Sequence, residues 1–166
     1  PVFSVDKEKE DGYPVQAHEL HDIIEDSDFL VISMTEHNGS YSAAFKNTLD
    51  WCSRLNNSVF HDKPMLLIST SPGKLGAKFS LEAALSRFPR HSANILGHFS
   101  LPSFQENFNN GIINEELAKE FNDLIANVPN AISWPRVARP LILPLCILRN
   151  FVLLGCNMFL LSVSSF

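Results

Sequence analysis

The sequence predicts an α/β fold built on a mostly parallel sheet. Two short apolar runs, residues 29–33 and 65–69, have the length and composition of buried strands, and a third strand is expected at about 94–100. Four segments space their apolar residues as helices do: 18–27, 42–55, 77–88 and 114–127. Strands that alternate with helices are typical of parallel sheets, because each helix returns the chain to the edge from which the next strand starts.

Length and composition agree with this class. The chain has 166 residues, 45% hydrophobic and 19% charged, which suits one domain and not two. Its net charge of −5 lacks the basic footprint of a nucleic-acid-binding protein. Three cysteines without a CxxC pair argue against a disulfide framework or a zinc site. No basic-then-apolar run opens the chain, so we expect no signal peptide and a cytoplasmic location.

The first elements follow from local signals. Residues 1–17 carry mixed charge, a glycine and a proline, and are expected to form a loop. Apolar residues then recur at helical spacing over 18–27, and the run at 29–33 is a strand buried on both faces. The next segment, MTEHNGSY at 34–41, is rich in turn-forming residues and predicts a loop.

The helix at 42–55 carries two apolar stripes. One can cover the sheet: Phe45, Leu49 and Cys52. The other lies on a different side: Ala44, Trp51 and Leu55. Because a monomer would leave the second stripe in water, we expect this helix to contact another subunit.

The strand–helix pattern then repeats and ends on a helix at 114–127. Asn114 can cap this helix, and Glu115 and Glu116 suit its positive end. We assign residues 1–127 to one partial α/β domain. Doubly wound sheets normally have about five strands. Since only three are visible and a helix precedes the first, we expect a strand–helix–strand unit to be missing before them.

Residues 128–166 form a tail that is rich in proline and then almost continuously apolar. Residues 142–163 are long enough for a membrane helix. Arg149 lies inside that span, however, and a central arginine costs about 2.5–3.5 kcal/mol on insertion, so a membrane anchor is not favoured. A non-native C-terminus, from a frameshift or unusual splicing, explains the tail at least as well.

Two loops lie where α/β proteins bind ligands, beyond the carboxyl ends of strands. In residues 35–40, Asn38-Gly39 permits a turn with positive φ and lets a flat ligand approach the backbone. Residues 69–76 combine hydroxyls, two glycines and Lys74 before a helix, which suits an anion or a polar ring edge. Neither loop is a Walker A or GxGxxG motif. On these residues alone, ordinary turns and helix caps are the simpler interpretation.

Other candidate sites are weaker. His18 and His21 share a helix face with Glu25, which a solvated acidic face explains better than a metal site. Cys52 lies in the middle of a helix and is expected to be packed rather than reactive. We therefore predict no metal ligands.

Longer segments carry a more specific signal. LVISMTEHNGSYSAAFKNTLDWCSR (30–54) precedes KPMLLISTSPGKLGAKFSLEAAL (63–85), and LPSFQENF (101–108) follows. The first two resemble segments that in NADPH-dependent FMN reductases usually read "lvi.tPEYNgs.pg.lKNalDW.sR" and "KPv.lvs.SpGrlGg.ra...L". The third fits the closing region of that family. The resemblance covers roughly residues 1–127, and its EHNGS…KNTLDW motif is fairly specific.

The resemblance implies a flavodoxin-like three-layer sandwich that binds FMN non-covalently. It implies hydride transfer from NAD(P)H through FMN to a small acceptor such as a quinone, in a homodimer or homotetramer with helix 42–55 near the interface. The flavin supplies the redox chemistry, so no catalytic side chain is assigned. Carried over by position, the residues that would border the isoalloxazine ring are Glu36, His37, Asn38, Gly39, Ser71, Pro72, Gly73 and Gly76.

Departures from the family pattern lead to further expectations. His37 stands where the family has tyrosine, and an imidazole there would make flavin reactivity sensitive to pH. The family's serine- and arginine-rich phosphate loop follows its first strand and has no counterpart in this sequence. We therefore expect this chain to bind FMN poorly and to be marginally stable as a monomer. The alternative function is a non-catalytic relative that acts only by subunit association.

Overall fold

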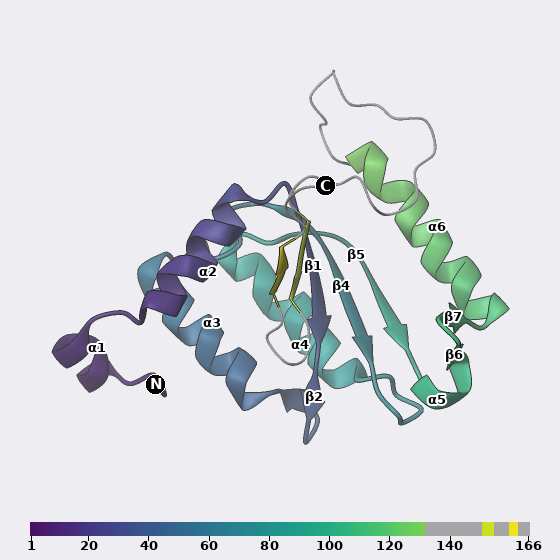
Figure 1. Ribbon diagram of the computed structural model, residues 1–166, viewed down its shortest axis with the longest axis horizontal. Helices are drawn as coiled ribbons and strands as arrows, with labels where there is room; N and C mark the ends of the chain where they lie inside the picture. Colours follow the sequence, from purple (N-terminus) through teal and green to yellow (C-terminus); the bar gives the residue numbers. More distant parts are fainter. Residues whose placement is uncertain (132–150, 155–159, 163–166) are drawn as a thin grey trace.

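The computed structural model describes residues 1–131, 151–154 and 160–162. Its centre is a five-stranded sheet in the order β5-β4-β1-β8-β9 (Figure 1). These strands are β1 (Phe29–Met34), β4 (Pro64–Thr70), β5 (Asn94–Leu101), β8 (Phe151–Leu154) and β9 (Leu160–Ser162). β1 runs parallel to β4 and β8, and β4 runs parallel to β5, which confirms the predicted α/β class.

Alternation along β1 divides the apolar core between the two faces of the sheet. Leu30, Ile32 and Met34 face the larger core, formed with α2 (Val15–Asp26), α3 (Ala43–Leu55) and α4 (Lys78–Arg87). Phe29 and Val31 face the smaller core, which α6 (Glu115–Ala131) covers. The result is the predicted arrangement of helices on both faces of a sheet (Figure 1).

The closing helix begins as its sequence indicates. The Asn114 side chain accepts a hydrogen bond from the amide of Leu117 at 3.0 Å, which caps α6. Gly97 in β5 lets α6 lie close to the sheet, because a Cβ at that position would collide with Leu124 Cδ1. The predicted cap is therefore confirmed, and Glu115 and Glu116 lie in the first turn as expected.

The N-terminal segment corrects two expectations. Residues 1–17 are not a loop, because Ser4 caps a short helix, α1 (Val5–Asp11), and α2 begins at Val15. The segment also covers Trp51 of the second stripe of α3, whereas Ala44 of that stripe is exposed. Phe3 packs edge-on against Trp51 with ring centroids 5.0 Å apart, and Trp51 Nε1 donates to the Pro1 carbonyl at 3.0 Å. Trp51 is 4% exposed, so the expectation that this residue stays in water in a monomer is wrong.

Residues from the tail add strands that the sequence analysis did not anticipate. β8 pairs with β1 on the side away from β4, and β9 pairs antiparallel with β8. Most of the apolar tail, including residues 142–150 and 155–159 of the possible membrane span, lies outside the described residues. Among the described helices, none has the length and apolar character needed to cross a membrane.

Short elements complete the described chain. Two-residue strands β2 (Glu36–His37) and β3 (Ser40–Tyr41) form a hairpin after β1. A 3-10 turn, η1 (Phe88–His91), follows α4. After β5 come α5 (Phe104–Asn107) and a second small hairpin made of β6 (Phe108–Asn109) and β7 (Ile112–Ile113).

Candidate functional site

The two loops singled out from the sequence leave the sheet side by side. Met34 at the end of β1 lies in register with Ser69 near the end of β4, and the strands are parallel. Residues 35–42 and 71–77 therefore start at the same carboxyl edge. This edge is where open α/β sheets bind their ligands.

The first loop is a tight hairpin. Asn38 and Gly39 have φ values of 52° and 70°, as a two-residue turn between antiparallel strands requires. The predicted positive-φ turn is thus confirmed. His37, Asn38 and Gly39 are exposed at its tip.

Glu36 ties this hairpin to the second segment of the site. Its Oε2 accepts a hydrogen bond from the backbone N–H of Ser80 at 3.0 Å. Ser80 lies in the first turn of α4, where N–H groups have no partner within the helix and a carboxylate is favoured. Glu36, on β2, therefore caps the start of α4, and its carboxylate points toward that helix.

The second loop is fixed at Gly76. Its φ is +57°, and an added Cβ would collide with Ser100 Oγ and lie 3.0 Å from the nitrogen of Pro102. The Gly76 carbonyl accepts hydrogen bonds from the hydroxyls of Ser69 at 2.7 Å and Ser100 at 2.9 Å. Glycine is required here by both backbone conformation and space.

The segment after β5 holds the outer part of the same loop. The amide of Ser103 donates to the Gly73 carbonyl at 2.9 Å, and that of Phe104 donates to the Ser71 carbonyl at 3.0 Å. Sequence reasoning assigned no role to Ser100 or Ser103. The signal that could have found them is the end of β5, which adjoins β4 and reaches the same edge.

The structure brings the predicted residues of the two loops, 36–39 and 71–76, to one edge of the sheet, but they do not form a single cluster. A Cβ added at Gly39 would lie 3.9 Å from Phe79 Cδ2, so the hairpin tip adjoins the start of α4. Gly73 and Lys74 are exposed, whereas Gly76 is buried. Two large apolar side chains beside these loops are also exposed, Leu75 and Phe79.

Two buried hydroxyls near the hairpin have no hydrogen-bond partner among the described residues: Tyr41 Oη and Ser80 Oγ. The Tyr41 ring stacks with Phe88 and contacts Phe45, on the core side of the hairpin. Burial raises the pKa of Tyr41 to about 12, although the charge of Arg87 opposes the shift. Tyr41 therefore remains protonated at neutral pH and is a packing group rather than a base.

The edge suits a flat ring better than a phosphate. A Cβ at Gly73 would meet only the Ser71 hydroxyl of its own loop, at 3.8 Å, so this backbone is open to a ligand. The exposed Gly39 provides a similar approach from the hairpin. In the loop segments 35–42, 71–77 and 102–114, Lys74 is the only lysine or arginine. The open backbone at Gly39 and Gly73 therefore fits a flat ring such as the isoalloxazine of FMN. For the phosphate, these loop segments contain one lysine, Lys74, and no arginine.

Comparison with known proteins agrees with this geometry. The family of NADPH-dependent FMN reductases matches residues 1–106, and the chain belongs to this family. The chain is similar in structure to FerB, a flavoenzyme NAD(P)H:(acceptor) oxidoreductase from Paracoccus denitrificans. The TM-score is 0.59 at 25% identity, and the match covers 78% of this chain and 73% of FerB.

Curated relatives are matched over part of their length. A quinone reductase of Escherichia coli (strain K12) is 34% identical over 76 residues, which are 46% of this chain and 40% of the relative. An NADPH:quinone oxidoreductase of Arabidopsis thaliana is 37% identical over 78 residues, 47% of this chain and 39% of the relative. The chain thus matches less than half the length of these relatives.

Proposed function

We propose that this chain provides the ring-binding edge of an NAD(P)H-dependent FMN oxidoreductase whose acceptor is a small molecule such as a quinone. The observation that carries the proposal is the convergence of two fixed loops at the carboxyl edge of β1 and β4, in a member of the FMN reductase family. The relatives are named as quinone reductases and oxidoreductases. These names do not favour a non-catalytic function.

In this proposal the protein orients and shields, and when bound, FMN would supply the redox chemistry by taking a hydride from NAD(P)H. The backbone of Asn38, Gly39 and Gly73 would lie against the ring, because these positions are exposed and two of them have no side chain. Glu36 keeps its negative charge on α4 through Ser80, and so away from the ring. Exposed Leu75 and Phe79 would exclude water at the rim and offer apolar contact to a quinone.

The affinity of this chain for FMN is expected to be low. A phosphate is normally held by several backbone N–H groups or basic side chains at a helix start. The amide of Ser80 is already bonded to Glu36, and Lys74 is the only lysine or arginine of the loops at this edge. We therefore expect FMN to exchange rapidly and to be lost on desalting.

Assembly and location remain part of the proposal. A homodimer or homotetramer through α3 would use the exposed part of that helix near Ala44 and Lys46, since the N-terminal segment covers Trp51. Light scattering coupled to gel filtration would test this assembly. The buried, unpaired thiol of Cys52 is compatible with a reducing compartment such as the cytoplasm.

The test of function is NAD(P)H oxidation by the full chain with free FMN in excess and a quinone as acceptor. We expect oxidation that needs both protein and FMN and exceeds the rate with FMN alone. Gly76→Ala, which should distort the second loop, would lower this rate, and His18→Gln, an exposed position on α2 outside both loops, is the control. The proposal is wrong if the folded chain adds nothing to the FMN-only rate.

A further inference from the structure

Two histidines meet at the edge of the sheet opposite the candidate flavin site. His21 lies on α2, which ends just before β1, and His61 lies between α3 and β4. Their Nε2 atoms are 3.2 Å apart although the residues are 40 positions apart in sequence. The rings meet edge to face with centroids 4.6 Å apart, and the His21 side chain is 22% exposed.

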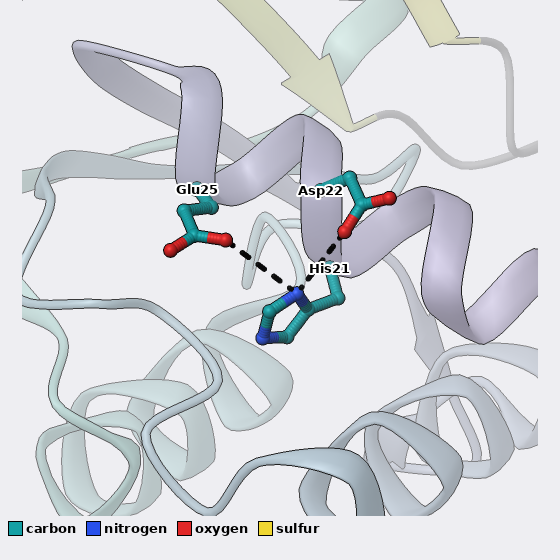
Figure 2. A group of neighbouring side chains, drawn as sticks. All are labelled: His21, Asp22 and Glu25. Carbon is teal, nitrogen blue, oxygen red and sulfur yellow. Dashed lines mark hydrogen bonds and ion pairs between the residues drawn. The ribbon is translucent and has the colours of Figure 1, made fainter.

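The other nitrogen of His21 faces acidic side chains. Figure 2 shows Nδ1 directed toward Asp22 and Glu25, at 3.4 Å from Asp22 Oδ1 and 4.0 Å from Glu25 Oε2. Carboxylates accept hydrogen bonds only, so they favour the proton of neutral His21 on Nδ1. The Nε2 lone pair is then directed at His61. The Asn56 amide nitrogen, 3.5 Å from the same Nε2, is likewise a donor to a lone pair.

The separation of the two Nε2 atoms matches that of two ligands on one metal ion. Imidazole nitrogens bind Zn²⁺ at about 2.0–2.1 Å, and tetrahedral angles then place two such nitrogens about 3.3 Å apart. A small cation could therefore bind both nitrogens with almost no change in the distance between them. We propose that His21 and His61 bind a divalent transition-metal ion, with water as the remaining ligands.

The surroundings resemble those of a histidine metal ligand. Such histidines commonly donate their second N–H to a carboxylate, which fixes the ring and makes it a better ligand. Asp22 and Glu25 occupy that position for His21. Their negative charge favours a cation, and it is opposed in part by Lys63, whose Nζ donates to the Glu25 carbonyl at 2.6 Å.

The backbone at His61 is consistent with a side chain held in place. His61 and Asp62 have φ values of 49° and 56°, so two successive residues that are not glycine adopt the left-handed conformation. Backbone bonds maintain this turn, since Asp62 N donates to the Ser92 carbonyl at 2.8 Å. The metal would join α2 to this turn and stabilise the amino edge of the sheet, far from the proposed redox chemistry.

The test is isothermal titration of the full chain with Zn²⁺, without flavin, alongside His21→Gln and His61→Gln variants. We expect one saturable site in the natural chain and at least tenfold weaker binding in each variant. His18→Gln is the matched control, because His18 lies on the same helix and is exposed, and it should bind as the natural chain does. Circular dichroism would establish that each variant is folded.

A second measurement keeps the proposal testable if a variant does not fold. NMR of the imidazole nitrogens in the natural chain should show Zn²⁺ shifting Nε2 of both His21 and His61. Absence of saturable binding would overturn the proposal. So would binding that requires His21, Asp22 and Glu25 but not His61, because the ion would then lie on the Nδ1 side.

Discussion

Gly76→Ala is expected to disrupt the second loop of the candidate flavin site. Gly76 has a φ of +57°, and its Cβ would collide with Ser100 Oγ and lie 3.0 and 3.1 Å from backbone atoms of Pro102 and Leu101. The Ser100 hydroxyl can rotate away, but it then gives up its hydrogen bond to the Gly76 carbonyl. The two backbone contacts can be relieved only by moving the chain.

The loss in the free energy of unfolding can be estimated from the backbone strain and the lost hydrogen bond. An L-residue in the left-handed region costs roughly 1–2 kcal/mol, and a lost hydrogen bond costs about 0.5–1.5 kcal/mol. With a small backbone shift, the free energy of unfolding should fall by about 2–4 kcal/mol. A domain of this size loses roughly 2–4 °C in Tm per kcal/mol, so a change of several degrees is expected.

Urea unfolding followed by circular dichroism measures this change, with Gly73→Ala as the control. Gly73 lacks a positive φ, and an added Cβ would meet only Ser71 Oγ at 3.8 Å. Its free energy of unfolding should therefore stay within about 0.5 kcal/mol of the natural value. If Gly76→Ala and Gly73→Ala are equally stable, the loop is not held as described.

Four further predictions concern individual side chains. Glu36→Ala should lower the free energy of unfolding by about 1 kcal/mol through loss of the cap on Ser80, and Glu36→Gln, which retains an acceptor, should lose less; denaturant titration separates them. Tyr41→Phe should be neutral or slightly stabilising at pH 7, because it removes a buried hydroxyl without a partner among the described residues, and a clear loss of stability would contradict this. Burial raises the pKa of Tyr41 from 10.0 to about 12 and that of Cys52 from 9.0 to about 11. The native state therefore holds these protons more tightly than the unfolded state, and this contribution to stability is full below pH 9 and is lost as the pH rises toward 12. In a variant with serine at the other two cysteines, a thiol reagent at neutral pH should label Cys52 only after denaturant is added; rapid labelling of the native chain would show an accessible thiolate.

The strands, main helices and hairpin turn could be predicted because their signals are local. Continuous apolar runs place β1 and β4, and Asn38-Gly39 specifies its turn without help from the rest of the chain. The cap on α6 follows in the same way from Asn114. In each case the residues that decide the structure lie within one short segment.

What could not be predicted depends on contacts between distant segments. The contact that Phe3 makes with Trp51 joins residues 48 positions apart, so Trp51, which the sequence placed at a subunit contact, is buried within the chain. The Glu36–Ser80 and His21–His61 contacts likewise span 44 and 40 positions. Loop composition located the candidate site, but only the fold shows that β5 holds the second loop.

The most direct test of the central proposal is an NMR titration of the full chain with FMN and, separately, with riboflavin, which has the ring but no phosphate. Amide signals of residues 36–39 and of the non-proline residues in 71–76 should shift with both ligands. Signals of His21 and His61, at the opposite edge, should not. Similar shifts with the two flavins would show that the ring is the part recognised. Shifts confined to other surfaces, or no saturable shift, would contradict the proposal that these two loops form a flavin site.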